Sequence, residues 1–322
     1  MRVLLRSVIA LALAVPAPNT IAAASDYPSR PIRFVVPFTA GSATDALARI
    51  LAQKLTAANG WTITVEDIAG ASGMLAASNV ARAAPDGFSV LITSNTTHAA
   101  NQALFKKLTY DPINDFAPIG KLGNITLALA VHPSVPVNNV RELIIFGKAN
   151  PGKLTFGSGS SSARVAGEML RVRGGFEMLH VPYKSNPLAV TDLLGGQISL
   201  VFADISTTLP QIRAGKVKGF GVSSAQRSQL APELPTMQEE GIAGYELTAW
   251  FAAFVPAKTP EMIVGKLNGA FNAALADKSV QEGLLNAGIE PLTGTPEELR
   301  QFVLSETQKW AEIVKAAGIE PE

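Results

Sequence analysis

The stretch FTAGSATDALARIL (residues 38–51) leads from an apolar run into a helix through a turn of small residues. Leu47, Leu51 and Leu55 recur at the spacing of one helix face. The run IRFVVPF (32–38) before the turn has the β-branched and aromatic content of a buried strand. The stretch therefore predicts a strand, a Gly/Ser loop and an amphipathic helix in succession.

The same order of features returns in FGSGSSSARVAGEML (156–170). A helix N-terminus presents unpaired backbone N–H groups and partial positive charge, and small residues allow a ligand close to the backbone. Neither loop has the lysine of a phosphate-binding loop, and serine replaces the third glycine of a dinucleotide motif. We interpret the pair as a clamp for a carboxylate. Ordinary strand-to-helix turns remain the alternative.

Further short apolar runs alternate with helical patterns, which is typical of α/β units with largely parallel sheets. The repeated strand–loop–helix unit predicts two lobes, with lobe 1 at 25–125 and 250–322 and lobe 2 at 126–249. Strands at 126–133 and 248–256 are expected to cross between the lobes. A capping box, TPEE (295–298), marks the start of the last helix. The expected fold is α/β, with two hinged lobes and the site between them.

The first 24 residues have the features of a secretory signal peptide. Arg2 and Arg6 precede an apolar run (8–15) that is too short to cross a bilayer, and Ala22–Ala24 offers a small-residue cleavage site. We expect cleavage after Ala24 and a periplasmic mature protein.

Composition excludes several classes of function. Without Arg2 and Arg6, the 27 basic residues become 25 against 26 acidic ones, so no basic surface is expected for nucleic acid or an anionic membrane. The chain has no cysteine, which excludes thiolate metal sites, cysteine nucleophiles and disulfides. We expect no cofactor and no metal.

Catalytic motifs are sparse. No G-x-S-x-G motif occurs, and the three histidines lack metal-ligand spacing. We expect structural roles for His132 and His180, whereas His98 follows a strand end and could brace a loop or bind a ligand. An exported hydrolase with Asp204 or His98 as general base remains an alternative, although no nucleophile or orienting partner is recognisable.

Ordered motifs along the mature chain carry a family resemblance. They include YPSRPIRFVVPFTAGSATD (27–45), ANPGKLTFGSGSSS (149–162), HVPYKS (180–185), TDLLGGQISLVFAD (191–204) and LPTMQEEGIAGYELTAWFAAFVPAKTP (234–260). The chain resembles the substrate-binding proteins of the tripartite tricarboxylate transporter family, the Bug-type periplasmic receptors. The resemblance implies a two-domain Venus-flytrap fold and capture of a small organic acid for a membrane permease.

The resemblance also implies the site residues. In the family, the P-F-x-x-G loop holds a ligand carboxylate through backbone groups and waters, and the lobe-2 serine loop closes over the other end. By position, the residues expected to contact the ligand are Phe38, Thr39, Ala40, Gly41, Ser42, Ser158, Gly159, Ser160 and Ser161. Asn95 and Asp204, at strand ends, are further candidates, because ligands bind at strand ends in open α/β sheets.

Two charged residues stand in the first turns of the paired helices. Asp45 favours its helix dipole, and we interpret it as a brace for the loop rather than a ligand contact. Arg164 opposes its dipole, and either Arg164 or Ala163 stands where family members often have histidine. One hypothesis is that Arg164 pairs with a second ligand carboxylate; the alternative is a solvated arginine. Ser42 replaces a glycine that is common in the family.

The same cleft would also suit a periplasmic sensor that presents its closed form to a signalling protein. We expect a monomer in either case. The sequence does not specify which acid is bound.

Overall fold

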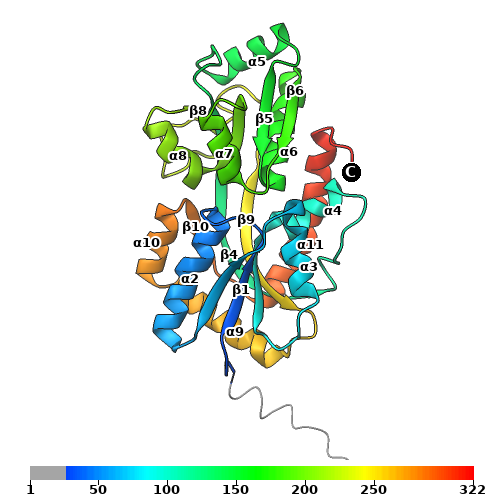
Figure 1. Ribbon diagram of the computed structural model, residues 1–322, viewed down its shortest axis with the longest axis vertical. Coiled ribbons are helices and arrows are strands. Elements are labelled where there is room, and N and C mark those ends of the chain that lie inside the picture. Colours follow the sequence, from blue (N-terminus) through cyan, green and yellow to red (C-terminus); the bar gives the residue numbers. More distant parts are fainter. Residues whose placement is uncertain (1–26) are drawn as a thin grey trace, which may run out of the picture.

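The computed structural model describes residues 27–322, so the expected signal peptide lies outside the described residues. The molecule is elongated and consists of two α/β lobes, one above the other (Figure 1). The fold predicted from the sequence is confirmed, with one difference: each sheet is mixed rather than mostly parallel. Three parallel strands in each lobe lie beside antiparallel neighbours.

The lobe-1 sheet has the strand order β2-β1-β3-β9-β4, and β10 pairs with β4 beside it. Its strands are β1 (Ile32–Val36), β2 (Ile63–Asp67), β3 (Ser89–Ser94), β9 (Thr248–Pro256), β10 (Ile289–Pro291) and the first part of β4 (Phe116–Val131). β1 pairs in parallel with β2 and β3, whereas β9 is antiparallel to β3 and to β4. The parallel strands β1 and β3 end at the edge that faces lobe 2.

Strand β4 passes through both lobes. Residues 116–126 pair with β9, and residues 127–131 pair with β7 and β8 of the second sheet. The chain returns to lobe 1 just before β9, because the Leu247 N–H donates to Ser223 O and Thr248 lies opposite Thr126. The return crossing therefore precedes β9 rather than running along it. Lobe boundaries at residues 126 and 249 stay a prediction.

The lobe-2 sheet pairs β5 in parallel with β6 and β7, and β7 lies antiparallel to β4. Its strands are β5 (Leu154–Ser158), β6 (Met178–Pro182), β7 (Leu200–Asp204), β8 (Lys218–Val222) and the last part of β4. Its helices are α5 (Val140–Ala149), α6 (Ser161–Gly174), α7 (Asn186–Leu194) and α8 (Ile205–Arg213). The ends of β5 and β7 bring α6 and α8 to the edge that faces lobe 1.

Helices cover both faces of the lobe-1 sheet, which explains why its strands are apolar on both sides. On one face lie α2 (Ala43–Asn59), α9 (Glu261–Leu275) and α10 (Lys278–Asn286). On the other lie α3 (Met74–Ala81), the π-helical turn η2 (Thr96–Ala100), α4 (Asn101–Leu104) and α11 (Pro296–Ala316), with the short turn η1 (Ala71–Gly73) before α3. Accordingly, Phe34 and Val36 pack toward α2 and α9, and Val35 packs on the opposite face.

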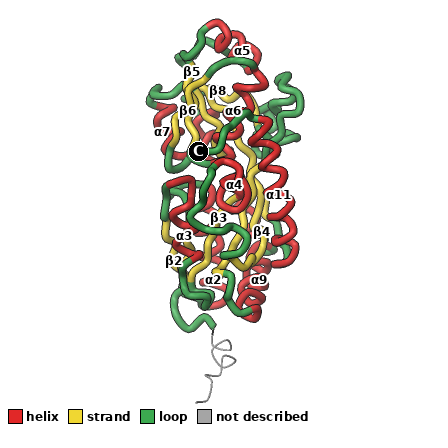
Figure 2. The backbone as a smooth tube through the Cα atoms, turned by 90° about the vertical axis from the view of Figure 1, so that its right-hand side faces the viewer, coloured by secondary structure: helices red, strands yellow, loops and turns green. Residues whose placement is uncertain are grey.

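Helix α11 runs alongside β4 and brings the end of the chain toward lobe 2 (Figure 2). The predicted capping box at its start is confirmed: the Glu298 N–H donates to Thr295 Oγ1 at 3.1 Å, and the Thr295 N–H donates to Glu298 Oε2 at 2.7 Å. After α11, the Glu322 N–H donates to Leu104 O and the Lys106 N–H donates to Glu322 O, at 3.1 and 2.8 Å. Glu322 is therefore fixed to lobe 1.

Candidate functional site

The loop between β1 and α2 forms the lobe-1 side of the cleft. Gly41 has φ +80°, a conformation that favours glycine, and it turns the chain into α2. Ser42 caps α2, since its Oγ accepts a hydrogen bond from the Asp45 N–H at 3.2 Å. The buried Asp45 carboxylate accepts from the Gly41 N–H at 2.9 Å and pairs with Arg49 at 2.6 Å. The loop is thus held by the first turns of its own helix.

The loop between β5 and α6 forms the lobe-2 side. Ser160 caps α6, because its Oγ accepts from the Ala163 N–H at 3.2 Å. The Gly159 N–H donates to Asn186 Oδ1 at 3.0 Å. A Cβ on Gly159 would lie 1.8 Å from the carbonyl carbon of Ser185, so only glycine fits there. This loop is therefore held by the segment that opens α7.

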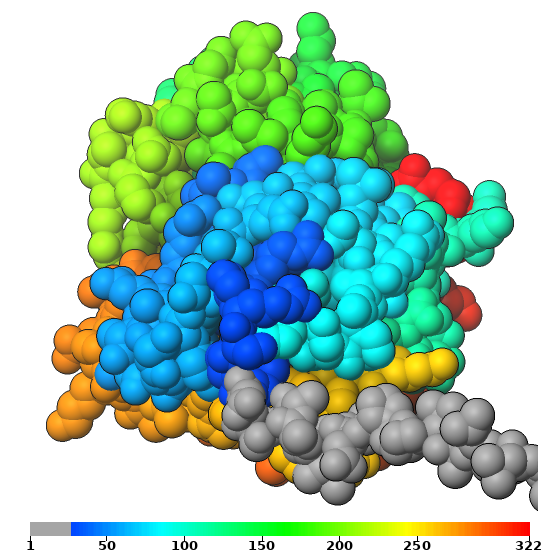
Figure 3. All heavy atoms as spheres, turned by 60° about the horizontal axis from the view of Figure 1, so that its bottom comes forward, coloured from blue at the N-terminus to red at the C-terminus, as the bar shows by residue number. Residues whose placement is uncertain are grey.

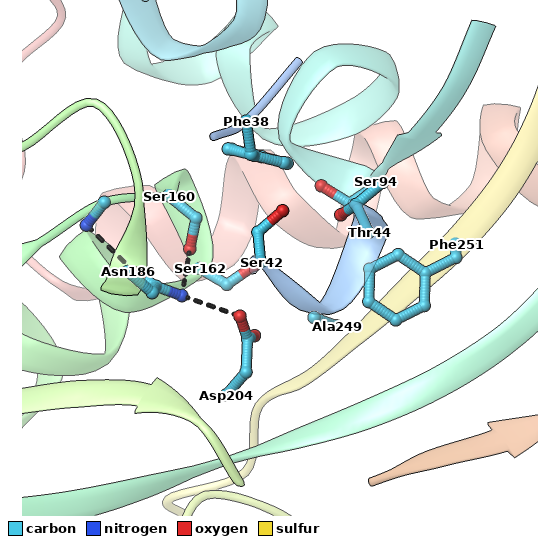
Figure 4. A pocket seen from close by; sticks show the side chains of 11 residues that line it. Phe38, Ser42, Thr44, Ser94, Ser160, Ser162, Asn186, Asp204, Ala249 and Phe251 are labelled. Carbon is cyan, nitrogen blue, oxygen red and sulfur yellow. Dashed lines mark hydrogen bonds between the residues drawn. The ribbon is translucent and has the colours of Figure 1, made fainter. Parts of the chain in front are cut away.

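A small cavity of about 20 Å³ lies between the two loops. Its lining residues are Phe38, Ser42, Thr44, Ser94, Gly159, Ser160, Ser162, Asn186, Asp204, Ala249 and Phe251 (Figure 4). The N-termini of α2 and α6 both open at this cavity, so their partial positive charges face the same space. A volume of this size holds about one water molecule. A larger ligand can enter only when the lobes move apart.

Direct contacts join the two lobes around the cavity. The Asn95 Nδ2 donates to Ser162 Oγ at 2.9 Å, and the Ser161 Oγ donates to Asn101 Oδ1 at 2.8 Å. The hydroxyls of Thr39 and Ser185 also form a hydrogen bond. In the space-filling view, lobe-2 atoms (green) lie directly against lobe-1 atoms (blue and cyan) (Figure 3). The structure is thus a closed form.

The expected ligand contacts divide into two groups. Phe38, Ser42, Gly159, Ser160 and Asp204 line the cavity. The rest lie beside it: Thr39, Asn95 and Ser161 join the lobes, Ala40 and Gly41 are exposed, and Ser158 lines a neighbouring cavity.

Asp204 lies at the end of β7 and directly before α8. Its Oδ2 accepts a hydrogen bond from Asn186 Nδ2 at 3.1 Å (Figure 4). Loss of surrounding water raises the pKa of the Asp204 carboxyl to about 6, and the Asn186 amide opposes part of that rise. Asp204 is the ionisable group among the cavity's described lining residues.

Sequence reasoning missed six lining residues: Thr44, Ser94, Ser162, Asn186, Ala249 and Phe251. Ser94 and Asn186 had a usable signal. Ser94 ends β3, where the strand-end rule applies, and Asn186 opens α7 directly after the motif HVPYKS. Ala249 and Phe251 lie on β9 and had no such signal. Which side of β9 reaches the cleft depends on its pairing with β4, which joins residues far apart in the sequence.

Arg164 lines a second cavity of about 190 Å³ on the other side of Gly159 and Ser160. Its Nη1 pairs with the carboxylate of Glu322, which belongs to lobe 1. The Arg164 side chain is 17% exposed, so it is not a freely solvated arginine. In this closed form Arg164 neutralises Glu322 and does not line the first cavity.

The histidines lie outside the first cavity. His98 is buried in η2, with its ring stacked on Phe254 at 3.8 Å, and burial lowers its pKa to about 3. His180 Nε2 lies 2.7 Å from Ser158 Oγ, and its pKa is lowered to about 4, chiefly by burial and then by Arg164. His132 contacts Ser134. Within residues 27–322, no cluster of metal-binding side chains occurs, and no helix is long and apolar enough to cross a membrane.

Residues 47–319 match the model of the tripartite tricarboxylate transporter family receptor. The chain belongs to this family. BugT of Bordetella pertussis is 33% identical over 298 residues, which are 92% of this chain and 91% of BugT. This receptor is therefore similar to curated family members over nearly its whole length, as its motifs predicted.

Solved structures show the same similarity to periplasmic binding proteins over nearly the whole chain. The receptor is similar to a structure from R. palustris with adipate (33% identity, TM-score 0.89), covering 92% of this chain and all of that one. It is also similar to the periplasmic binding protein BugD (36% identity, TM-score 0.87), again covering 92% and 100% of the two chains. The receptor thus shares its fold with periplasmic binding proteins.

Proposed function

We propose that this receptor captures a small organic acid in the periplasm and delivers it to the permease of a tripartite tricarboxylate transporter. The observation that carries the proposal is the pair of capped helix N-termini, α2 and α6, which open from different lobes onto one polar cavity. Backbone N–H groups and serine hydroxyls suit a carboxylate without help from a metal. The adipate in a relative's structure supports this class of ligand.

The closed cavity supports a mechanism of capture by lobe movement. The lobes separate, the acid enters, and closure places one carboxylate between Ser42 and Ser160. Closure on the acid leaves a cavity larger than the ~20 Å³ of this structure, and the hydrogen bonds of Asn95 and Ser161, which lie beside it, then reform across the cleft. Charge-assisted hydrogen bonds contribute about 1.5–3 kcal/mol each, so four or five of them, less the cost of ordering, give roughly micromolar affinity. The ligand shifts the equilibrium toward the closed form that the permease recognises.

We infer that the protein binds rather than transforms its ligand. Three histidines contact a hydroxyl, namely His180 with Ser158, His132 with Ser134 and His98 with Thr97, and all three pairs lie outside the cavity between the helix termini. Asp204, the general base of the enzymatic alternative, has an amide rather than a nucleophile as its hydrogen-bond donor. A bound acid should therefore be recovered unchanged.

A thermal-shift panel tests the proposal. The purified protein is screened against mono-, di- and tricarboxylates, amino acids, sugars and phosphate, and a narrow set of carboxylates should raise its Tm. Stabilisation by sugars or phosphate, with none by any carboxylate, would contradict the proposal. Sequencing the N-terminus of periplasmic protein should give Ser25 as the first residue.

Removing the lobe-2 hydroxyls tests the site. The Ser160→Ala/Ser161→Ala variant should lose at least tenfold in carboxylate affinity, because it lacks two hydroxyls on the closing side. It also lacks the α6 cap and should lose about 1 kcal/mol of stability without ligand. Ser224→Ala/Ser228→Ala, in lobe 2 outside the cavity, is the matched control and should bind as the parent does. Equal affinity in both variants would remove the serine loop from the site.

A further inference from the structure

Asp204 occupies the N-cap position of α8, but its side chain does not cap that helix. An aspartate at this position usually accepts a hydrogen bond from a backbone N–H of the first turn. Here the hydroxyls of Thr207 and Thr208 donate to the backbone carbonyl of Asp204, at 2.8 and 3.2 Å. The carboxylate is turned away from its own helix and into the cavity.

The carboxylate has one acceptor atom to spare. Asn186 donates to Oδ2, and none of residues 27–322 donates a hydrogen bond to Oδ1. Figure 4 shows the carboxyl group pointing toward Asn186 and the serines of the two loops. A hydrogen-bond donor on the ligand would complete this group, whereas a second ionised carboxylate would repel it.

No cation offsets Asp204 in the cavity. None of the described lining residues is Lys, Arg or His. The charged groups in the first turns of the facing helices point elsewhere, Asp45 to Gly41 and Arg49, and Arg164 to Glu322.

The charged side chains of the neighbouring helices α7 and α8 are also engaged. Asp192 of α7 accepts a hydrogen bond from the Tyr183 hydroxyl, and Arg213 of α8 pairs with Glu233. The positive elements are the N-termini of α2, α6, α7 and α8, and a negative charge on the ligand beside Asp204 is favoured when a donor stands between them.

We propose that Asp204 is a specificity-determining residue that requires a hydrogen-bond donor on the ligand in addition to the clamped carboxylate. The inference rests on the proposed function and narrows its ligand class. The donor is a hydroxyl, an ammonium group, or the proton of a second carboxylic acid. A dicarboxylate therefore binds with one proton shared between its second carboxylate and Asp204, as in other close pairs of carboxyl groups.

The affinities for a dicarboxylate and for an ω-amino acid should depend on pH in opposite directions, because only the dicarboxylate takes up a proton on binding. The pKa of Asp204, raised to about 6 by loss of water, means that Asp204 is mostly ionised at pH 7.5. A dicarboxylate must then take up a proton on binding, so its affinity rises as pH falls toward 6, by up to about tenfold per pH unit. An ω-amino acid needs ionised Asp204, so its affinity falls as pH drops below 6.

Isothermal titration calorimetry on a matched six-carbon series tests the proposal. The probes are hexanoate, 6-hydroxyhexanoate, 6-aminohexanoate and adipate, with the equivalent four-carbon series beside them. At pH 7.5 the hydroxy and amino acids should bind at least tenfold more tightly than the unsubstituted acid. Titrations in two buffers of different ionisation enthalpy should show uptake of about one proton with the dicarboxylate and none with the amino acid.

The Asp204→Asn variant separates this role from a structural one. It should lose tenfold or more in affinity for the ω-amino acid, and its dicarboxylate affinity should become independent of pH between 6.5 and 7.5. Asp192→Asn, the same change on α7 outside the first cavity, should leave both properties unchanged. The proton-uptake measurement needs no variant, so it decides the proposal even if Asp204→Asn does not fold.

The outcomes are distinct. Carboxylate binding without donor preference and without proton uptake would overturn the role of Asp204 and leave the proposed function standing. If no carboxylate of these series or of the thermal-shift panel bound at pH 5.5 or 7.5, both the inference and the proposed organic-acid receptor would be contradicted.

Discussion

The two helix N-termini that face the cavity are built in opposite ways. In lobe 1, Asp45 in the first turn of α2 favours the helix dipole and holds Gly41 in place. In lobe 2, Arg164 in the first turn of α6 opposes the dipole and is neutralised by Glu322 from lobe 1. The α2 loop thus takes its cap and its brace from its own helix, although Thr39 also contacts Ser185 of lobe 2, whereas the α6 loop and its first turn have Asn95, Asn101 and Glu322 of lobe 1 as partners.

This difference suggests how closure is made to depend on the ligand. The lobe-1 loop keeps its shape when the lobes separate, so it can receive the acid first. The lobe-2 loop loses its partners Asn95, Asn101 and Glu322 on opening, because all three belong to lobe 1. Closure restores these contacts, and the ligand adds those that make the closed form favourable.

The largest expected effect comes from the glycines of the two loops. Gly159→Ala would place a Cβ 1.8 Å from Ser185 backbone and should destabilise the protein by more than the ~1–3 kcal/mol typical of overpacking. Gly41→Ala meets no atom within 4 Å and should cost only its backbone strain, roughly 1–2 kcal/mol. Chemical denaturation of both variants measures the difference.

Gly265→Ala is the control for these glycines, because that helical position has open space and an ordinary φ. It should be neutral or slightly stabilising. A Gly159→Ala variant as stable as the parent would show that the packing of the α6 loop on α7 is not as close as described.

Asp45→Ala should remove the brace of the lobe-1 loop. The buried carboxylate accepts a hydrogen bond from the Gly41 N–H and forms an ion pair with Arg49. Its loss should therefore cost about 1.5–3 kcal/mol of stability. Glu66→Ala, which removes an exposed partner of Arg33, should cost less than about 1 kcal/mol. Similar urea midpoints for the two variants would contradict the bracing role.

The stability of the protein should also depend on pH through His180, which contacts Ser158 at the start of the lobe-2 loop. Its pKa is about 4 in the folded protein against 6.5 as the ordinary value, so the unfolded chain binds more protons between these pH values. Stability should therefore fall as pH drops from 6.5 to 4. His98 adds to this loss and Asp204, with its raised pKa, opposes it between pH 4 and 6.

The His180→Gln variant isolates the effect of this residue. The slope of unfolding free energy against pH should decrease by up to one bound proton in that window. An unchanged slope would show that groups other than His180 cause the loss of stability in acid.

The smallest expected effect belongs to the partly exposed ion pair between Arg164 and Glu322, which joins the lobes. Glu322→Gln should reduce the ratio of closed to open form by about 1.4- to fivefold, since surface pairs contribute about 0.2–1 kcal/mol. The effect should shrink at high salt. Glu320→Gln, with an exposed side chain two residues away, is the matched control. Equal closed fractions in the two variants would show that the ion pair between Arg164 and Glu322 does not stabilise the closed form.

Most of the fold was predictable because its signals are local. Apolar runs predicted strands at 32–38 and 248–256, where β1 and β9 lie, and the capping box placed the start of α11 at Pro296. The first half of β4 was missed because Pro118, Gly120 and Gly123 interrupt its apolar pattern, and register shifts accommodate them in the pairing with β9. Strand β10 was missed because three residues are too few to show a period.

The site was predictable only in part, since a cavity depends on distant contacts. The loop motifs identified Ser42 and Ser160, and the strand-end rule identified Asp204. The partners of Asn95 and Ser161 lie 60 or more residues away, so their roles between lobes had no local signal. The same holds for Arg164, whose partner Glu322 reaches it through the path of α11.

The most direct test of the central claim is the distance between the lobes as a carboxylate is added. Because the chain has no cysteine, Lys107→Cys and Lys184→Cys can be labelled specifically, one exposed site on each lobe. Pulsed electron spin resonance should show a broad distribution without ligand that narrows and shortens, saturably, with the carboxylate selected by thermal shift. Saturable carboxylate binding without any change in that distance would contradict capture between the lobes.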